Sequence, residues 1–264
     1  MLRLTNIYKL FNPGSVDEKT ALAGINLQLN PGDFVTVIGS NGAGKSTLMN
    51  IISGALQPDM GKVVIDGRDV TRLPEFKRSA LIGRVFQDPM AGTAPRMTIE
   101  ENLAMAWKRG QARGLKFGVT RRKREMFREQ LARLGIGLEN RLFAKVGLLS
   151  GGERQALSLL MATFTNPRIL LLDEHTAALD PARADLITRL TETIVREQKL
   201  TTLMVTHNME QAIRLGNRLI MMDNGRIILD IDPEKKKTLT VERLLYEFEQ
   251  ISGHKLTDDR IVLG

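Results

Sequence analysis

The hydrophobic pattern of the N-terminal third predicts strands joined by turns. Leu2–Leu10 and Ile25–Leu29 alternate in part between apolar and polar residues, and Phe34–Ile38 is a β-branched run suited to a buried strand. A glycine-rich turn follows that run, and a helical pattern then covers Ser46–Ser53. Two further short strands are expected, over Val63–Ile65 and Leu81–Phe86.

The pattern changes between about Pro89 and Leu149. β-branched runs become rare there, and Glu100–Trp107 and Arg121–Leu134 have the apolar spacing of helices. We interpret this stretch as a helical insertion.

Strands alternate with helices in the C-terminal half. The expected elements are a strand over Ile169–Leu172, a helix over Ala182–Gln198, and strands over Thr202–Val205 and Leu219–Met222. Such alternation favours a parallel sheet covered on both faces. After Pro233 come three lysines, 235–237, and then an amphipathic helix expected over Val241–Ile251.

Length and composition exclude several classes of protein. The 264 residues suit one large α/β domain or a domain with a small insertion. The lack of cysteine excludes disulfides, cysteine nucleophiles and thiolate metal sites. The longest clean apolar stretch, Ile169–Leu172, falls far short of the roughly 20 residues that a membrane helix needs. We therefore expect a soluble protein of the cytoplasm.

The charge excess is local. The chain carries 38 Lys and Arg against 30 Asp and Glu, a formal net charge of +8. The segment Lys108–Arg128 alone accounts for it, because its basic residues are opposed there only by Glu125. An excess of this kind suggests nucleic acid or an anionic membrane surface as a partner. The basic residues are Lys108, Arg109, Arg113, Lys116, Arg121, Arg122, Lys123, Arg124 and Arg128.

A phosphate-binding motif follows the strand Phe34–Ile38. Its pattern, G-x-x-x-x-G-K-S, has the expected strand before it and helix after it. Glycines let backbone N–H groups converge on phosphate oxygens, Lys45 can reach the β- and γ-phosphates, and the Ser46 hydroxyl can bind Mg²⁺. The alternative is a strand–helix corner whose glycines merely permit the turn. The motif residues are Gly39, Ser40, Asn41, Gly42, Ala43, Gly44, Lys45, Ser46 and Thr47.

Two acids end the strand Ile169–Leu172. Asp173 can hold Mg²⁺ opposite Ser46, and Glu174 can polarise an attacking water as a general base. An apolar run followed by two acids also occurs where a strand merely meets solvent, so the phosphate-binding motif gives this pair its significance.

A third motif, Leu149–Gln155, reads LSGGERQ. Ser150 and Glu153 match a helix capping box, which explains the helix start but not Gly151 and Gly152, each costing helix stability by roughly 1 kcal/mol. Bare N–H groups at a helix N-terminus suit a second phosphate-binding surface. With the two preceding motifs in order, LSGGERQ resembles the signature of ABC-type ATPases.

The resemblance extends from Leu2 to about Leu229. It implies an α/β fold: a P-loop NTPase core with a mostly parallel sheet, N-terminal antiparallel strands and an inserted helical subdomain. The implied domains are an ABC ATPase domain over 1–232, with core segments 1–88 and 150–232 around a helical subdomain at 89–149, and a C-terminal extension over 233–264. Two copies would form a head-to-tail homodimer with ATP between the P-loop of one and the signature of the other.

The resemblance also implies roles for single residues. Gln87 would join Ser46 and Asp173 at Mg²⁺, and His207 would contact the γ-phosphate. Phe11, or else Tyr8, would stack on adenine. The catalytic residues would be Glu174, His207, Gln87 and Lys45. The residues reaching the ATP of the other copy would be Ser150, Gly151, Gly152, Glu153 and Asp180.

Two positions depart from the family pattern. His175 follows Glu174 where many relatives have proline, either as a turn variant or as a group that tunes the glutamate. The segment Asn12–Thr20 is longer than the short turn expected there. His254 has no motif around it and is interpreted as a surface residue.

We therefore expect the ATPase subunit of an ABC transporter, peripheral on the inner face of the cell membrane. The expected cofactors are ATP and Mg²⁺. The expected partners are membrane permease subunits and an extracytoplasmic substrate-binding protein of an import system, with amino acids as a possible substrate class. The alternatives are an exporter or lipid-moving ATPase and a soluble ABC ATPase acting on DNA or the ribosome. Nucleic acid is not expected as a partner, because one P-loop, one signature and an insertion without heptads differ from the usual DNA-acting members. The basic segment would instead meet acidic permease loops or anionic lipid, or be a solvated helix face.

Overall fold

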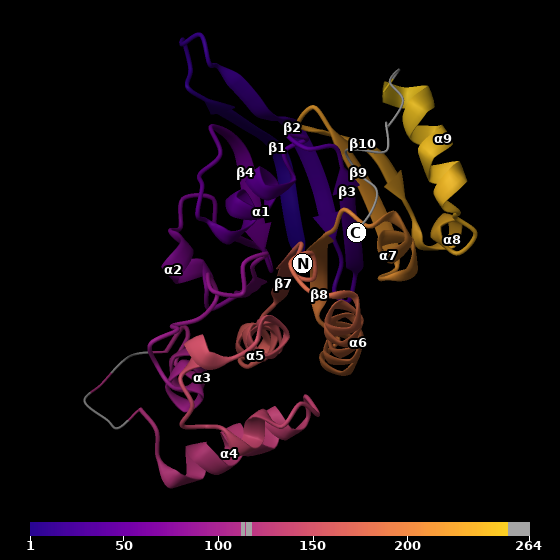
Figure 1. Ribbon diagram of the computed structural model, residues 1–264. Helices are drawn as coiled ribbons and strands as arrows, with labels where there is room; N and C mark the ends of the chain where they lie inside the picture. Colours follow the sequence, from indigo (N-terminus) through magenta and orange to yellow (C-terminus); the bar gives the residue numbers. More distant parts are fainter. Residues whose placement is uncertain (112–113, 115–117, 253–264) are drawn as a thin grey trace. The chain divides into compact units, whose positions relative to one another are not determined.

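The computed structural model describes residues 1–111, 114 and 118–252 of a chain that divides into two compact units. The first unit combines Met1–Arg78 with the chain from Leu200 onward, and the second is Ser79–Lys199 (Figure 1). The predicted helical subdomain, 89–149, lies within the second unit, and its boundaries stay a prediction. Arg113, Lys116 and His254 lie outside the described residues.

An antiparallel sheet forms the N-terminal part of the first unit. Its order is β2-β1-β4-β5. The apolar positions of the first strand are buried, as its alternation predicts. The second strand starts well before the predicted Ile25, so the irregular segment between the two strands shrinks to 12–18. The strands are β1 (Leu2–Phe11), β2 (Lys19–Leu29), β4 (Met60–Ile65) and β5 (Arg68–Asp69).

Parallel strands form the centre of the first unit. β3 (Phe34–Gly39) pairs in parallel with β8 (Thr201–Val205) on one side and with β9 (Arg218–Asp223) on the other. β10 (Arg226–Ile231) then pairs antiparallel with β9. Every residue of β3 and β8 is buried, which is typical of parallel strands covered on both faces.

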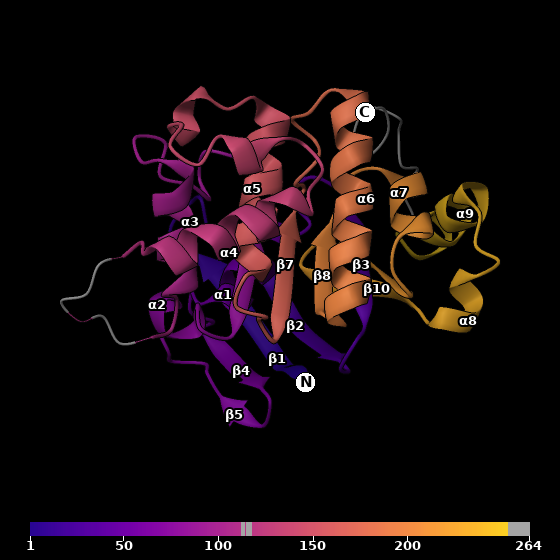
Figure 2. The ribbon, with the colours of Figure 1, turned by 90° about the horizontal axis from the view of Figure 1, so that it is seen from below.

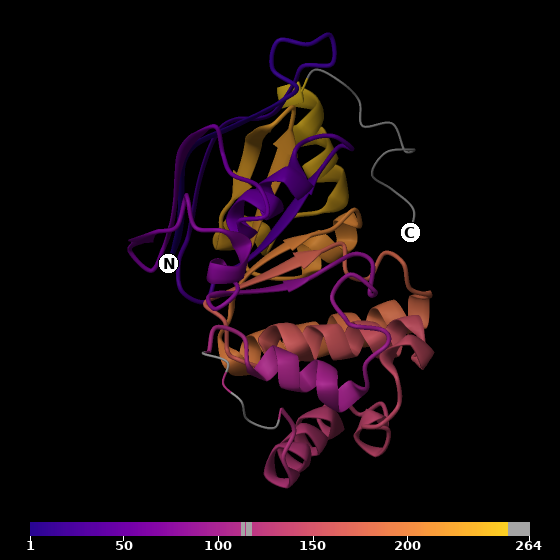
Figure 3. The ribbon, with the colours of Figure 1, turned by 90° about the vertical axis from the view of Figure 1, so that its left-hand side faces the viewer.

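The helices of the first unit include the predicted amphipathic helix near the C-terminus. Its apolar residues Leu244 and Phe248 pack against Ile38, Leu219 and Met221, so the extension joins the core of this unit. In Figure 3 this yellow helix lies beside the orange strands of the same unit. The helices are α1 (Lys45–Ser53), α2 (Glu75–Arg78), α7 (Met209–Arg214), α8 (Pro233–Lys236) and α9 (Val241–Ser252).

A buried arginine closes the C-terminal end of α1. The Arg78 guanidinium donates to the carbonyl oxygens of Ile51 and Ile52 at 2.7 and 2.9 Å, and to those of Thr71 and Leu73, both at 2.9 Å. The last carbonyls of a helix have no partner within the helix, so a buried cation there is stabilising. Sequence patterns did not predict this role for Arg78, which holds the helix that follows the phosphate-binding loop.

The second unit pairs two parallel strands and groups helices around its own core. β6 (Ile82–Val85) pairs in parallel with β7 (Ile169–Asp173). Figure 2 shows α3, α4 and α5 grouped together, around a core that includes Leu103, Phe127 and Leu157. The helices are α3 (Ile99–Trp107), α4 (Arg121–Ala132), α5 (Gly151–Thr163) and α6 (Pro181–Gln198), with two 3₁₀ turns at Leu138–Asn140 and Val146–Leu148.

One residue of the basic segment is paired with an acid that lies outside the segment. Arg124 makes two hydrogen bonds, of 2.6 and 3.1 Å, to the carboxylate of Glu100, an acid of α3 outside the segment. Arg109 is half-buried, with Nη1 3.5 Å from the carbonyl oxygen of Ala162. The exposed basic surface of α4 is therefore carried by Arg122 and Arg128, together with Arg121, which pairs with Glu125 at 3.4 Å.

Short elements were missed by the hydrophobic pattern. β5, β10, α2, α7 and α8 span at most six residues each, too few for a period to register. In the part of the chain that the structure describes, no helix has the length and apolar character needed to cross a membrane.

Candidate functional site

The predicted phosphate-binding loop connects β3 to α1 in the first unit. The Lys45 side chain is 6% exposed, and its ammonium donates to the carbonyl oxygens of Gly39 at 2.7 Å and Ser40 at 3.0 Å. The ammonium therefore lies within the arch of the loop. Ser46 on the next turn is exposed.

Two glycines of this loop are required by close backbone approaches. A Cβ atom at Gly39 would lie 2.1 Å from the carbonyl oxygen of Met222, and one at Gly44 would lie 2.4 Å from that of Ala21. Gly44 also has φ +99° and begins α1 without a side-chain cap. The first N–H groups of the helix therefore have no capping side chain, as an anion-binding helix start requires.

The turn between β9 and β10 supports the same loop. The Ser40 hydroxyl donates to Asp223 Oδ1 at 3.0 Å, and the Gly225 amide donates to the carbonyl oxygen of Ala43 at 3.1 Å. Sequence analysis missed these residues. Their signal was present, because Asn-Gly is the strongest short-range indication of a hairpin.

His207 follows β8, the parallel neighbour of β3. Carboxyl ends of parallel strands share one edge of a sheet, so His207 and the phosphate-binding loop, which follows β3, lie at the same edge. Two hydrogen bonds fix the preceding Thr206. Its amide donates to the carbonyl oxygen of Val37 at 3.1 Å, and its hydroxyl donates to Gln211 Oε1 at 2.6 Å. Asn208 caps α7 through a 2.8 Å bond from the Gln211 amide.

The two candidate aromatic residues differ in their surroundings. Tyr8 lies over Gly24, where its hydroxyl is 2.9 Å from the position a Cβ would take. Phe11 ends β1 and pairs in register with Lys19, whose ammonium is 3.5 Å from the Cβ position of Gly42 in the phosphate-binding loop. This proximity favours Phe11 over Tyr8 for an adenine contact.

In the second unit, the carboxylates end β7 and Gln87 follows β6. Asp173 Oδ2 lies 3.0 Å from Nη2 of Arg84 on the neighbouring strand, and the two side chains are 14% and 12% exposed. Glu174 adopts φ +46°, a conformation that non-glycine residues rarely take. Gln87 is exposed. Because β6 and β7 are parallel, Gln87, Asp173 and Glu174 lie at one edge.

His175 is buried and bonded to α6, so it is more than a variant of the turn after Glu174. Its side chain is 1% exposed, and Nε2 lies 3.0 Å from the Thr191 hydroxyl of α6. That hydroxyl donates its proton to the carbonyl oxygen of Ile187 at 2.8 Å. It must therefore accept the bond from the imidazole, so Nε2 of His175 is protonated and donates to Thr191. Burial lowers the pKa of His175 to about 4, and the ring is therefore neutral. His175 thus fixes the end of β7 to α6.

The signature segment starts α5 with the predicted capping box. The Ser150 amide donates to Glu153 at 2.7 Å, and the Glu153 amide donates to the Ser150 hydroxyl at 3.3 Å. Burial opposes ionisation of Glu153, but the bonds from Ser150 and the nearby Arg141 lower its pKa overall. A Cβ at Gly152 would lie 2.9 Å from Cδ of Arg183. Close packing against Arg183 is therefore a further reason for a glycine at this position.

The residues around Asp180 and Gln155 link neighbouring parts of the second unit. Asp180 caps α6, accepting a 3.2 Å bond from the Arg183 amide. Gln155 is fully buried and donates to the carbonyl oxygen of Phe86 at 3.1 Å, which joins α5 to the residue before Gln87. Sequence analysis assigned no role to Gln155, although it is the last residue of LSGGERQ.

Each unit carries oxygen atoms of the kind that bind magnesium together with a polyphosphate. Among the residues that the structure describes, no three His, Cys, Asp or Glu side chains gather as a metal cage. Mg²⁺ commonly takes one or two protein oxygens and completes its shell with phosphate oxygens and water. In the first unit the Ser46 hydroxyl is exposed and the buried Lys45 ammonium suits phosphate charge. In the second unit, considered by itself, the Asp173 carboxylate is a possible oxygen ligand.

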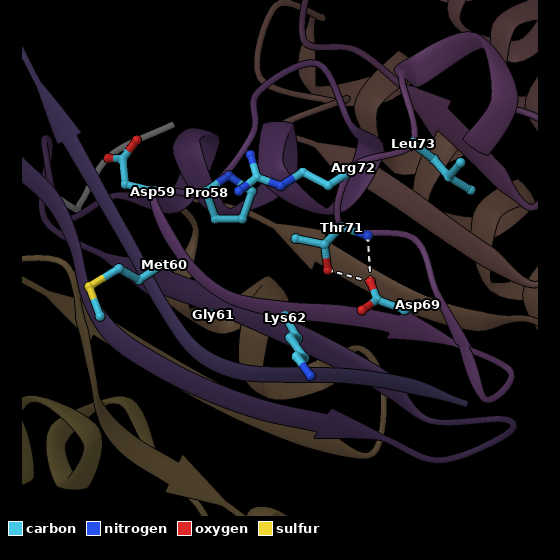
Figure 4. A pocket seen from close by; sticks show the side chains of 9 residues that line it. All are labelled: Pro58, Asp59, Met60, Gly61, Lys62, Asp69, Thr71, Arg72 and Leu73. Carbon is cyan, nitrogen blue, oxygen red and sulfur yellow. Dashed lines mark hydrogen bonds between the residues drawn. The ribbon is translucent and has the colours of Figure 1, made fainter.

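A separate cavity of about 470 Å³ lies beside β4 and β5 in the first unit (Figure 4). Its polar part is a local turn, in which the amide and hydroxyl of Thr71 donate to Asp69 at 2.9 and 2.6 Å. None of the predicted site residues lines this cavity.

Comparison with known proteins identifies the family. Residues 22–177 match the family model described as ABC transporter. A tyrosine transport ATP-binding protein of Clostridioides difficile is 44% identical over 249 residues, 94% of this chain and 99% of the relative. A methionine import ATP-binding protein of Halalkalibacterium halodurans is 32% identical, covering 98% of this chain and 76% of the relative.

Solved structures support the same family assignment. A dimeric ATP-binding cassette in a post-hydrolysis state, bound to ADP and Pi, matches with a TM-score of 0.75 at 32% identity, covering 88% of this chain and 99% of the other. An ATP-binding cassette in its ADP conformation matches with the same TM-score at 27% identity, over 96% and 97% of the two chains. The expected fold class is confirmed, and the chain belongs to the family of ABC transporter ATP-binding proteins.

Proposed function

We propose that this subunit hydrolyses Mg²⁺-ATP at the interface of a homodimer and thereby powers a membrane importer. The observation that carries the proposal is the phosphate-binding loop, where the buried Lys45 ammonium lies within the arch beside an uncapped helix start. A buried cation with open N–H donors is what a triphosphate requires.

The proposed chemistry is in-line attack of water on the γ-phosphorus, which breaks the bond to the β–γ bridging oxygen and releases ADP and inorganic phosphate. Glu174 accepts the proton of the attacking water, and Lys45 and His207 stabilise charge on the γ-phosphate oxygens. Ser46, Asp173 and Gln87 would hold Mg²⁺, which would neutralise negative charge on the phosphates. Asn41, Gly42, Ala43 and Thr47 complete the phosphate cradle, and Phe11 stacks on adenine.

The proposed dimer completes each site with residues of the other copy. The N-terminal turn of α5, with Ser150, Gly151, Gly152 and Glu153, approaches the γ-phosphate bound by the opposite P-loop. Asp180 lies in the segment through which the copies meet. A related cassette crystallised as a dimer with ADP and Pi, which supports this arrangement.

We further propose that the transported substrate is an amino acid. The tyrosine transport relative aligns over nearly its whole length, and a further relative is named for the import of another amino acid, methionine. Relatives named for spermidine/putrescine or thiamine import share less identity than the tyrosine transport relative. The permease subunits, an extracytoplasmic binding protein and a peripheral position on the membrane follow from an import system of this class.

Three experiments test this proposal. Affinity purification of the full chain from native membranes should recover integral membrane subunits, and deletion of the chain should abolish uptake of labelled aromatic amino acids. Recovery of an export system instead, or of specific salt-sensitive DNA complexes without a permease, would overturn the import assignment. Lys45→Ala should weaken ATP binding in a direct titration, which tests the site separately from the substrate.

A further inference from the structure

A buried lysine connects the C-terminal extension to the elements that carry the phosphate-binding loop and His207. Lys236 ends α8 and is 5% exposed. Its neighbours Lys235 and Lys237 are exposed and form ion pairs with Asp232, the N-cap of α8, and with Glu234. One lysine of the triplet therefore differs from the other two in environment.

We propose that Lys236 is a positioning residue for ATP hydrolysis, holding α7 on β3 so that His207 keeps its place beside the phosphate-binding loop. The inference rests on the proposed function for its effect on catalysis. The structural link itself does not depend on that function.

The first contact of Lys236 is with the end of α7. Its ammonium donates to the carbonyl oxygen of Leu215, the C-cap residue of that helix, and lies 3.4 Å from the carbonyl oxygen of Arg218 at the start of β9. The last carbonyls of a helix need partners outside the helix. Lys236 supplies one, and so fixes the end of α7 opposite to Asn208 and His207.

The second contact is with β3. The ammonium donates to the Thr36 hydroxyl at 3.2 Å, and that hydroxyl donates to the carbonyl oxygen of Ala212 in α7 at 2.8 Å. Thr36 is fully buried and lies three positions before Gly39, the first residue of the phosphate-binding loop. One polar network thus joins α8, α7 and the strand that leads into the loop.

Apolar contacts surround this network. Leu239, Leu244 and Phe248 of the extension form one buried cluster with Ala212 of α7 and Ile38 of β3. Figure 1 shows α7, α8 and α9 next to one another. At its other end α7 is tied to the residue before His207 by the Thr206–Gln211 bond. A shift of α7 would therefore move His207.

The charge on Lys236 is unusual for a purely structural role. Among the described residues, no carboxylate lies within ion-pair distance of its ammonium, and burial lowers its pKa to about 8. An apolar side chain would fill the space without this desolvation penalty. The three hydrogen-bond acceptors that converge on Nζ explain why a lysine stands there.

The test compares Lys236→Met with Lys235→Met in the full chain. Methionine keeps the length of the side chain but has no donor. With Lys236→Met we expect the kcat of ATP hydrolysis to fall about tenfold while the KM for ATP stays within twofold. With Lys235→Met both constants should stay at the wild-type values.

A spectroscopic readout tests the link without relying on catalysis. The chain has three histidines, so the ¹H–¹³C resonances of the imidazole Cε1 atoms can be assigned by substitution. Lys236→Met should shift the His207 resonance and leave that of His175 in place. If Lys236→Met does not fold, Thr36→Val removes the shared hydroxyl and should produce the same shift.

The outcomes separate the two proposals. A folded Lys236→Met or Thr36→Val variant whose His207 resonance and kcat match the wild type would overturn the inference. If the wild-type chain hydrolyses no ATP but Lys236→Met still shifts the His207 resonance, the proposed function is overturned and the link between Lys236 and His207 is retained. A fall in kcat that also occurs with Lys235→Met would overturn the specific role of Lys236.

Discussion

The Arg84 guanidinium lies 3.0 Å from the Asp173 carboxylate, on the neighbouring parallel strand of the second unit. Arg84 also lies over the ring of Phe86, with its Cζ 4.6 Å from the ring centroid. The carboxylate that we propose as a magnesium ligand is therefore already balanced by a largely buried cation. An acid in such a place depends on its partner, because an unpaired buried charge is strongly unfavourable.

Replacing Arg84 by methionine should make the stability of the folded chain depend more strongly on bound Mg²⁺-ATP. The variant leaves Asp173 without its cation, and we expect the free energy of unfolding to fall by about 1–3 kcal/mol. Mg²⁺-ATP should raise its melting temperature more than that of the wild type. Arg72→Met removes an exposed arginine that bonds Gln57 and serves as the control. Equal melting temperatures of Arg84→Met and wild type would contradict this account.

The bond between His175 and Thr191 predicts an effect on turnover. Glu174 holds a positive φ, which costs of order 1 kcal/mol and persists only where neighbours enforce it. His175→Leu removes the bond to α6, and we expect kcat to fall several-fold with ATP binding unchanged. His175→Gln keeps an N–H donor at the Nε2 position and should retain more activity. Identical kinetics of the two variants would show that the bond to Thr191 does not position Glu174.

Much of the fold could be predicted because its strands are long and its motifs are local. The run Phe34–Ile38 is apolar or β-branched throughout, and the glycines that follow it specify both the loop and the helix start. Asn208, Asp180 and Ser150 lie at helix starts for reasons that a capping rule captures.

Long-range partners could not be predicted in the same way. Arg78, Arg84 and Lys236 are charged residues that sequence patterns place on the surface, yet each is largely buried by partners distant in the sequence. Glu100 neutralises Arg124 across 24 positions of the chain. Such pairings depend on tertiary packing, which neither residue type nor local period reveals.

The basic surface of α4 predicts association with membranes. Reversing Arg121, Arg122 and Lys123 to glutamate should weaken binding to vesicles containing anionic lipid, since each basic group near such a surface contributes about 1 kcal/mol. ATP hydrolysis in solution should be unaffected. The matched control reverses three exposed basic residues of the first unit, Lys62, Arg68 and Arg72. Equal loss of binding by both triple variants would indicate general charge attraction rather than a role for α4.

The pKa of Lys236 predicts a pH dependence of stability. Burial lowers that pKa from its ordinary value of 10.5 to about 8. Between these values the unfolded chain binds a proton that the folded chain does not, so this site makes the free energy of unfolding rise with pH. The rise in urea unfolding experiments between pH 8 and pH 9.5 should be steeper for the wild type than for Lys236→Met. Parallel pH profiles would mean that the Lys236 pKa is not lowered by folding.

The central claim is that Glu174 activates water for ATP hydrolysis in a dimer. The most direct measurement combines ATPase activity and molecular mass in solution for wild type and Glu174→Gln, with Mg²⁺-ATP present. The substitution keeps the shape of the side chain and removes its basicity. We expect Glu174→Gln to lose at least 100-fold in kcat, on the order of the contribution of a general base, and to accumulate as an ATP-bound dimer. Undiminished hydrolysis by this variant, or a monomer at saturating ATP, would contradict the account.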